Sequence, residues 1–334
     1  MDYNELAVIR PISKDDLTGF YQLALSAGIG MTSLPKDNDL LLNKINVSLE
    51  SFNNISKNID DYLFLFVLEH IKDKKIIGCS GIVNVGTELE PAYYLKLDIN
   101  NSNMKLVNHY QGAAELCSLY LSKDFRKNNN GKLLSRSRLL FMQINDMFKN
   151  KKVIAEMRGY FDENNESPFW NEVFSQKFNM TVREAIETRA NGHKQKIIDM
   201  MGFEPIDISN MSERTKKILG QVHSSTKAAR GLLEREGLHF NNYVDLIDSG
   251  PALEANIREL ITIKDTKNYQ IQGFSENSNF KGKNKFIICN NEPVNFRACI
   301  SEVIINDNNK IELPESVKYA LNLENNKAVS IVEL

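Results

Sequence analysis

The stretch from residue 115 to residue 138 constrains the fold of this chain more than any other. Its first part, ELCSLYL, is a short and mostly apolar run between polar residues, which is typical of a buried strand. The polar sequence SKDFRKNNNG follows and predicts a loop, because Asn and Gly favour turns. KLLSRSRLLFMQINDMFK then shows apolar residues at helical spacing. The stretch therefore predicts a strand, a loop and the start of a helix.

This order of elements favours the binding of an anion. The backbone N–H groups of the loop and the unpaired N–H groups of the first helical turn point at one place, where the helix dipole favours negative charge. Arg126, Lys127 and Lys132 add positively charged side chains. These residues fit a phosphate site, and they fit an ordinary strand–helix connection with a solvated basic loop equally well.

The spacing Arg126-x-x-Asn129-x-Gly131 resembles the R/Q-x-x-G-x-G/A pyrophosphate loop of the GNAT superfamily of acyl-CoA-dependent N-acyltransferases. In that superfamily the strand before the loop splays from its neighbour, and its free backbone groups hold the acyl carbonyl and the pantetheine arm. Asn129 stands where the pattern has Gly, but Asn tolerates a left-handed backbone best after Gly, so we expect the loop to keep its shape. The resemblance implies an acyl-CoA site formed by Leu119, Tyr120, Leu121, Arg126, Lys127, Asn129, Asn130, Gly131 and Lys132.

The order of the other predicted elements extends this resemblance. Before the central strand, apolar patterns predict a strand, two helices and a two-stranded hairpin, at residues 7–10, 15–25, 39–52, 62–69 and 75–85. After the central helix they predict a strand at residues 153–158 and a helix at 167–178, with Ser167 as its N-cap. This is the GNAT order, and it implies an α+β fold with a mixed sheet flanked by helices.

Three segments are expected along the chain. Residues 1–181 are expected to form the GNAT-like acyl-CoA-binding domain. Residues 182–254 repeat a closing helix–strand pattern, with a helix at 225–236 and a strand at 243–247, and predict a partial second GNAT-like unit that completes the active site. Residues 255–334 carry short β-type runs between Asn-rich turns and predict a small β-rich C-terminal domain.

Several ordered motifs make the resemblance more specific. LAVIRP, ELCSLYL with FRKNNNGKLLSRSR, AEMRG, SPFW, GQVHSSTKAARGLLEREG and NYVDLIDSGPALE occur in this order. Together they resemble the bacterial arginine N-succinyltransferase family, over all but the C-terminal part of the chain. The resemblance implies transfer of a succinyl group from succinyl-CoA, a co-substrate, to the α-amine of L-arginine in arginine catabolism. Two alternatives remain: another GNAT N-acyltransferase, acting on ornithine or a related amine, and a non-catalytic acyl-CoA-binding regulator.

The expected chemistry requires a group that moves a proton near pH 7, and His is the side chain suited to it. Of the five histidines, His223 lies in GQVHSST between two predicted helices, and loops on a rigid scaffold often carry catalytic residues. From the residues alone, a His that satisfies local turn groups explains the position too. GQVH matches the family segment whose His is taken as the proton donor, so the resemblance implies a catalytic role for His223. His109, just before the central strand, is the second choice.

Cys117 in the central strand raises a rival mechanism through a covalent succinyl-cysteine. A Cys in a strand of alternating burial is more often an inert core thiol, and GNAT enzymes mostly use direct attack. Direct attack of the amine on the thioester is therefore the predicted mechanism.

Substrate recognition requires further charges. The succinyl carboxylate and the arginine α-carboxylate each favour a cation, for which Arg158 is the best candidate and Arg10 a weaker one. The guanidinium of the acceptor favours carboxylates, and Glu115 and Glu156 lie on strands expected to be central. Ordinary strand-end ion pairs are an equally good explanation for each of these residues.

Bulk properties limit the expected partners. The formal net charge is −2, so we expect no nucleic acid and no anionic membrane as a partner. The N-terminal sequence has no apolar signal core, and the longest apolar run, residues 62–68, is too short to span a bilayer. The four cysteines form no C-x-x-C pair, so we expect no metal site and reduced thiols in a cytoplasmic protein. Both a homo-oligomer and a pairing with a paralogous subunit are compatible with the sequence.

Overall fold

The computed structural model describes residues 5–28, 31–57, 59–87 and 91–334. Its strands are β1 (Ala7–Pro11), β2 (Leu63–His70), β3 (Lys75–Asn84), β4 (Tyr93–Asp98), β5 (Asn103–Asn108), β6 (Ala114–Leu121), β7 (Lys152–Glu156), β8 (Ile206–Asp207), β9 (His239–Val244), β10 (Pro251–Asn256), β11 (Lys267–Ser275), β12 (Lys285–Asn290), β13 (Ala298–Glu302), β14 (Ile304–Asn306), β15 (Lys310–Pro314) and β16 (Ala328–Glu333). Its α-helices are α1 (Leu17–Ser26), α2 (Asn38–Asn53), α3 (Asn130–Gln143), α4 (Pro168–Trp170), α5 (Gln176–Phe178), α6 (Val182–Ala190), α7 (Lys194–Met201), α8 (Glu213–Ile218), α9 (Lys227–Glu236), α10 (Ile261–Asp265) and α11 (Glu315–Leu321).

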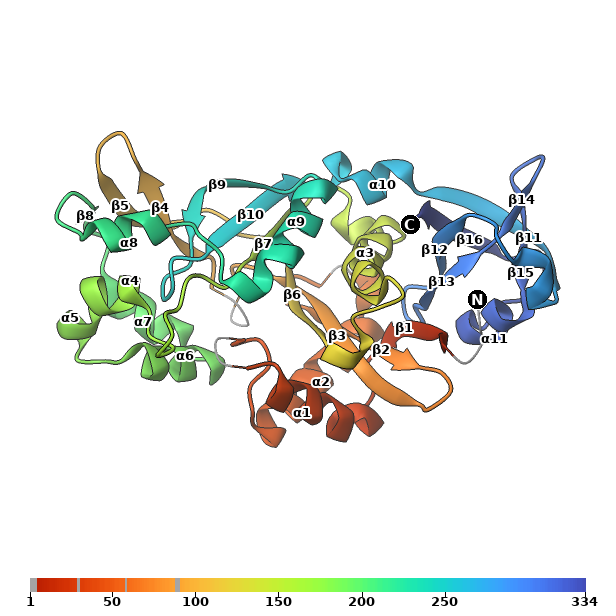
Figure 1. Ribbon diagram of the computed structural model, residues 1–334, viewed down its shortest axis with the longest axis horizontal. Coiled ribbons are helices and arrows are strands. Elements are labelled where there is room, and N and C mark those ends of the chain that lie inside the picture. The colour runs from red at the N-terminus through yellow and green to blue at the C-terminus, as the bar shows by residue number, and fades with distance from the viewer. Residues whose placement is uncertain (1–4, 29–30, 58, 88–90) are drawn as a thin grey trace.

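Within the described residues the strands form one sheet, in the order β14-β15-β11-β16-β12-β13-β1-β2-β3-β6-β7-β10-β9-β4-β5-β8. Figure 1 shows the elongated molecule that results, with β6 and β7 near its middle. The strands β11 to β16 lie at one end, and β4, β5 and β8 lie at the other.

The middle of the sheet is buried on both faces. The strands β1, β2, β3 and β6 are antiparallel neighbours, and β6 then pairs with β7 in parallel. In β2, Phe64 and Phe66 pack with the core of α3, whereas Leu63 and Leu65 pack with the core of α1 and α2. Since alternate residues of a strand point to opposite faces, helices on both sides explain the unbroken apolar sequence of β2.

Local sequence signals set the ends of several helices. The Asp37 carboxylate accepts a hydrogen bond from the backbone N–H of Leu40 at the start of α2, at 2.9 Å. Ser167 caps α4 in the same way, as its sequence position predicted. Gly237 has a φ of 111° and ends α9 in the left-handed conformation that glycine adopts without strain.

The predicted α+β class with a GNAT-like mixed sheet flanked by helices is confirmed. The β4–β5 hairpin and α7 were not predicted, and the strand expected at residues 243–247 lies earlier, in β9. The helix expected at residues 132–149 starts at Asn130 and ends at Gln143. The described sheet runs through all three predicted segments, and their division into domains, with a partial second GNAT-like unit, stays a prediction. In the described part of the chain, none of the helices has the length and apolar character needed to cross a membrane.

Candidate functional site

The strands β6 and β7 separate near the centre of the molecule. The two strands pair in parallel at two positions, Ala114 with Val153 and Glu115 with Ile154. Beyond them, two residues of β6, Ser118 and Leu119, face one residue of β3, and Ser118 takes a left-handed backbone with a φ of 53° at this bulge. A bulge bends its strand, so β6 and β7 diverge like the arms of a V whose closed end is at Glu115. The facing edges of the two arms carry backbone groups that are open to a ligand.

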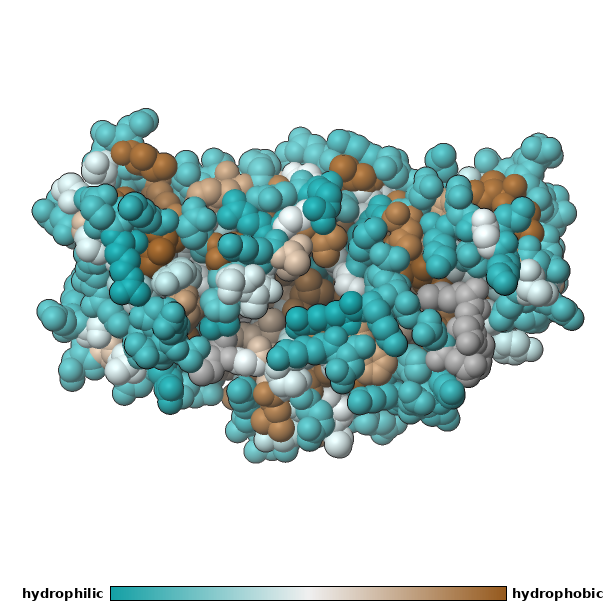
Figure 2. All heavy atoms as spheres, in the orientation of Figure 1, coloured by the Kyte–Doolittle hydropathy of each residue, from teal (hydrophilic) through white to brown (hydrophobic). Residues whose placement is uncertain are grey.

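A cavity of about 370 Å³ occupies this opening. Its walls come from the arms of the V, from α2, α3, α6 and α9, and from the loop between β9 and β10. Figure 2 shows hydrophobic atoms in a hollow near the middle of this face, with hydrophilic atoms around it. The charged side chains of the wall that bear on the chemistry are Glu115, Arg138, Glu156, Arg158, Arg189 and Asp248.

The loop between β6 and α3 has the geometry of an anion site. Asn129 has a φ of 62°, so it takes the left-handed backbone that its place in the loop required. In the described residues, the backbone N–H groups of Gly131 and Lys132 make no backbone hydrogen bond, whereas those of Asn130 and Leu133 do. A Cβ atom added to Gly131 would meet open space within 4 Å. Two free N–H groups and an open approach thus coincide at the start of α3.

The predicted acyl-CoA residues lie in the last part of β6, in the loop and in the first turn of α3. Leu119 lines the cavity, while the Tyr120 side chain turns to the α1 face and donates a hydrogen bond to the carbonyl oxygen of Ser26 at 2.7 Å. Arg126 and Lys127 are exposed in the loop, and Lys132 is half-buried in the first turn of α3. The side chain of Tyr120 therefore faces away from the cavity, and its carbonyl oxygen lies against β3.

His223 opens the turn before α9. Its backbone N–H donates to the carbonyl oxygen of Arg158 at 2.9 Å, and both Arg158 and Thr226 line the cavity. The backbone N–H of Ser225 donates to Nδ1 of His223 at 3.2 Å, so the neutral ring carries its proton on Nε2. The Ser225 hydroxyl lies 2.6 Å from Nδ1 and can accept a hydrogen bond from Nδ1–H when the ring is charged. Burial and the nearby Arg158 guanidinium lower the pKa of His223, which favours the neutral ring at pH 7.

Neither His223 nor His109, the second choice, is among the residues that line the cavity, but the His223 turn borders it through Thr226 and Arg158. The His109 ring stacks on Tyr243 at 4.3 Å between centroids, and its Nε2 lies 4.0 Å from the carboxylate of Glu254. The structure therefore places His109 away from the residues that the sequence assigned to the acyl-CoA.

Cys117 lines the cavity at the level of the bulge. Burial, together with the charge of Glu115, raises the pKa of its thiol to about 12. The thiolate is the nucleophilic form of cysteine, and it is scarce at neutral pH with such a pKa. This environment favours the prediction that Cys117 is not the nucleophile.

The predicted substrate carboxylates differ in their surroundings. Glu115 is buried at the closed end of the V. Glu156 forms ion pairs with Arg189 and, at 3.6 Å, with Lys194. Burial alone would raise the pKa of Glu156, but the two cations outweigh burial and hold it at about 2. Glu156 is thus ionised and already bound within the protein, and guanidinium binding by it stays a prediction.

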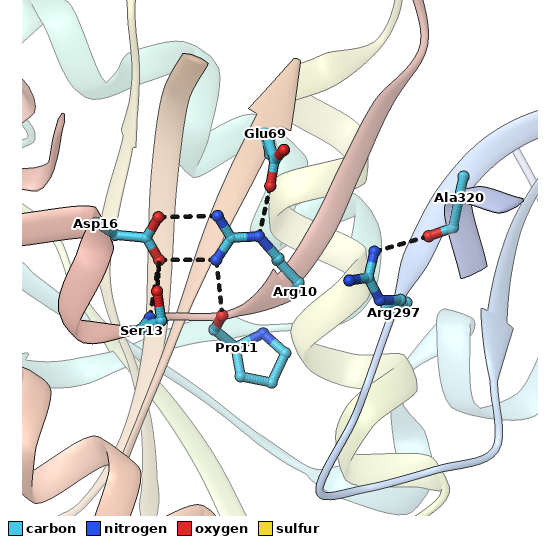
Figure 3. A network of polar contacts seen from close by, with 7 residues as sticks. All are labelled: Arg10, Pro11, Ser13, Asp16, Glu69, Arg297 and Ala320. Atoms are coloured by element: carbon cyan, nitrogen blue, oxygen red, sulfur yellow. Dashed lines mark hydrogen bonds and ion pairs between the residues drawn. The ribbon is translucent and has the colours of Figure 1, made fainter. Parts of the chain in front are cut away.

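Arg10 is not part of the cavity wall. Figure 3 shows its guanidinium held by the carboxylates of Asp16 and Glu69. The hydrogen bonds to Asp16 are 2.7 and 2.8 Å long, and the one to Glu69 is 2.5 Å long. The weaker candidate for a substrate carboxylate is therefore wrong, because Arg10 forms a structural ion-pair network beside β1 and β2 instead.

Arg158, by contrast, lines the cavity and is part-buried. Its guanidinium lies 4.7 Å from the ring centre of Phe161 and forms no ion pair with a carboxylate of the described residues. Burial lowers its pKa, and the charge of Asp248 opposes that effect. Arg158 is thus a cation with capacity for an anionic ligand.

Sequence reasoning missed five charged residues of the described wall: Lys44, Arg138, Arg189, Asp245 and Asp248. Arg138 projects from α3 and is 1% exposed. Asp248 accepts backbone hydrogen bonds from Gly159 and Gly250, both at 2.8 Å, while burial and the charge of Asp245 raise its pKa to about 7. A signal for Arg138 was present, since positions 134, 138 and 141 fall on one helical face and the other two are apolar. Asp245 and Asp248 lie in the motif NYVDLIDSGPALE.

Comparison with known proteins gives a consistent result. A family model described as Arginine N-succinyltransferase beta subunit matches residues 7–262. The chain is 33% identical to the Arginine N-succinyltransferase of Yersinia pestis (strain Pestoides F), over 98% of this chain and 97% of that protein. It is 37% identical to that of Enterobacter sp. (strain 638), over 78% and 79%. The structure of the arginine/ornithine succinyltransferase subunit AI from Pseudomonas aeruginosa is similar with a TM-score of 0.86 and 27% identity, covering 98% of this chain and 99% of that chain.

Proposed function

The chain belongs to the arginine N-succinyltransferase family, and on that premise we propose that it transfers the succinyl group of succinyl-CoA to the α-amine of L-arginine. The observation that carries the proposal is the V between β6 and β7. It joins a helix N-terminus with free N–H groups to a cavity whose walls hold both cations and carboxylates. A thioester donor and a charged amino acid together need both features.

In this proposal the donor lies along β6. The pyrophosphate is held at the start of α3 by the N–H groups of Gly131 and Lys132, with Arg126 and Lys127 nearby. The pantetheine arm follows the open edge of β6 past Leu119. The thioester then reaches the bulge at Ser118, where backbone N–H groups can stabilise negative charge on the carbonyl oxygen.

The chemical step is a direct attack. The neutral α-amine attacks the thioester carbon, the new C–N bond forms, and the C–S bond breaks. His223 takes up at Nδ1, through the Ser225 hydroxyl, the proton that the amine loses, and gives its Nε2 proton to the departing sulfur, so the products are an amide and free CoA thiol. The Ser225 hydroxyl accepts from Nδ1 while the ring is charged. Both the lowered pKa of His223 and its place beside the cavity support this role.

The acceptor is recognised by its charges. Arg158 is the proposed partner of the α-carboxylate, because it lines the cavity next to the His223 turn. Glu115 and Glu156, with Asp248, are the proposed carboxylate environment of the guanidinium. The ion pairs of Glu156 with Arg189 and Lys194 would hold its carboxylate in place.

The test is turnover by the purified full chain. Release of CoA thiol is measured with succinyl-CoA and L-arginine, and the product is identified by its mass and by the position of the amide. We expect turnover that requires both substrates. No turnover by a folded protein that binds succinyl-CoA would contradict the enzymatic assignment and favour a binding role.

L-Ornithine is a second candidate acceptor. The similar structure from Pseudomonas aeruginosa is of an arginine/ornithine succinyltransferase subunit. The two amino acids share the α-amine and the α-carboxylate and differ in the side-chain cation. The ratio of kcat/KM for the two acceptors decides between them, and we expect a preference for arginine.

Assembly and compartment complete the proposal. The matching family model describes a beta subunit, which supports an oligomer of identical chains or a pairing with a related subunit. Light scattering on the purified chain, alone and after co-expression with a paralogue, measures which one forms. We place the reaction in the cytoplasm, where the free cysteines of the described chain stay reduced.

A further inference from the structure

Arg138 is a buried charge without a charged partner. Its side chain is 1% exposed, and in the described residues it forms no ion pair within 4 Å. Among the described residues, Nε and Nη2 reach only Ser135, one turn earlier, at 3.3 and 3.5 Å, and Nη1 has no hydrogen-bond partner. A buried guanidinium in this state is costly, because charges leave water at low cost only when they are paired. Such a group is expected to have a partner that arrives from outside the protein.

Other arginines of the described chain show the usual solution. Arg10 is bound by Asp16 and Glu69, and Arg189 is bound by Glu156 and Asp245. Within the described residues, the fold therefore supplies carboxylates to these two part-buried arginines and none to Arg138, which is more deeply buried. Because Arg138 lines the cavity, an anion in the cavity can reach its guanidinium.

The position of Arg138 identifies which anion. Arg138 lies eight residues after Asn130, which is about 12 Å along α3 from its N-terminus. Cys117 lies four residues before Leu121, which is about 13 Å along β6 and likewise away from the loop between β6 and α3. Arg138 and Cys117 therefore stand at one level, and the electrostatic interaction between their side chains agrees with this. This level lies at the bulge, two residues short of the closed end of the V at Glu115.

A donor that enters at the start of α3 points its acyl chain toward this closed end. In the binding mode proposed above, the pyrophosphate and the thioester occupy the open part of the V, which directs the atoms beyond the thioester carbon past the bulge. Resting on the proposed function, we propose that Arg138 binds the terminal carboxylate of the acyl donor and so selects acyl-CoA substrates whose acyl group ends in a carboxylate. Arg158, on the other arm and next to His223, is then left for the acceptor.

Lys44 is the rival for this role. It projects from α2, lines the cavity and acts electrostatically on Cys117 from the opposite face of the sheet. Its side chain is only half-buried, so solvent already stabilises its charge, and an ammonium lacks the two-pronged geometry with which a guanidinium binds a carboxylate. The test therefore compares the two residues directly.

The experiment compares succinyl-CoA with butyryl-CoA, which has the same chain length and no carboxylate. Both donors are measured with L-arginine and the wild type, Arg138→Met, Arg138→Lys and Lys44→Met. In Arg138→Met we expect kcat/KM for succinyl-CoA to fall by roughly 100-fold, while that for butyryl-CoA changes less than about threefold. Arg138→Lys should restore part of the succinyl preference, and Lys44→Met should keep it.

Two results would overturn the proposal: an unchanged succinyl preference in Arg138→Met, or a loss of that preference in Lys44→Met alone. An equal loss with both donors, while CoA still inhibits with its wild-type constant, would overturn it as well. That pattern would mean that Arg138 acts on the acceptor or on the fold.

Donor binding without any acceptor separates this proposal from the proposed function. Calorimetry with succinyl-CoA and butyryl-CoA measures whether the wild type binds the former more tightly and whether Arg138→Met loses the difference. That outcome supports the role of Arg138 even for a chain that transfers nothing to arginine. Equal affinity of the wild type for both donors would overturn the role of Arg138, whatever amine proves to be the acceptor. If Arg138→Met does not fold, the two donors are compared in Arg138→Lys instead. This variant keeps the positive charge and removes the two-pronged guanidinium.

Discussion

The backbone N–H of His223 and the carbonyl oxygen of Arg158 are joined by a hydrogen bond of 2.9 Å. This bond links the turn before α9 to the chain just beyond β7, so the proposed proton carrier and the proposed acceptor-binding cation share one piece of backbone. The Arg158 guanidinium also lowers the pKa of His223, second to the effect of burial. The two residues are therefore coupled in position and in charge.

His223→Gln should lower kcat by roughly 10²–10⁴, the usual effect of losing a positioned acid or base. The affinity for succinyl-CoA and the melting temperature should stay near the wild-type values, because the His223 side chain bonds only within its own turn. His239→Gln is the matched control, since His239 is exposed in β9. A near-normal kcat in His223→Gln would remove this residue from the chemistry.

The pH dependence of kcat follows from the same pKa. A ring whose pKa is lowered by folding is neutral above its ordinary value near 6.5, and only the neutral ring can take up the amine proton. The rate should thus fall as pH decreases, with a midpoint below about 6.5. Arg158→Ala removes one cause of the lowered pKa and should move this midpoint to higher pH. A midpoint that stays in place would show that Arg158 does not act on the ring in the enzyme–substrate complex.

Gly131→Val should raise KM for succinyl-CoA, because its branched side chain would occupy the open space at the start of α3. Gly273→Val is the control, since a Cβ added to Gly273 in β11 also meets open space. Asn129→Gly should be tolerated, as glycine adopts the φ of 62° more easily than asparagine. If Gly131→Val binds CoA normally with its fold intact, the pyrophosphate does not lie at this turn.

Cys117→Ala should retain kcat within roughly threefold, and no succinyl-enzyme should be trapped when arginine is withheld. The reason is the pKa of about 12, which leaves the thiol protonated at neutral pH. Cys289→Ala, at a buried thiol in β12, controls for loss of packing. Accumulation of an acyl-enzyme in the wild type would instead establish the covalent route.

The centre of the fold was predictable because its signals are local. A strand, an Asn/Gly-rich loop and the start of a helix are encoded within residues 115–138, and the left-handed Asn129 follows from its residue type. The charges of the site were less predictable, since pairing is decided by residues far apart in sequence. Glu69 neutralises Arg10 from 59 positions away, and Arg189 takes up Glu156 from 33. The unpaired state of Arg138 likewise became visible only when α3 was placed against the cavity.

Arg158→Ala should act on the acceptor and leave the donor preference unchanged. Loss of a charged hydrogen bond to the α-carboxylate should raise KM for L-arginine by roughly 10- to 100-fold. The ratio of kcat/KM for succinyl-CoA over butyryl-CoA should stay at its wild-type value, because Arg138 is the proposed partner of the acyl carboxylate. Arg183→Ala, at an exposed arginine of α6, should change neither quantity. A donor ratio that falls toward one in Arg158→Ala would exchange the roles of the two arginines, since the cavity would then hold the acyl carboxylate beside the His223 turn.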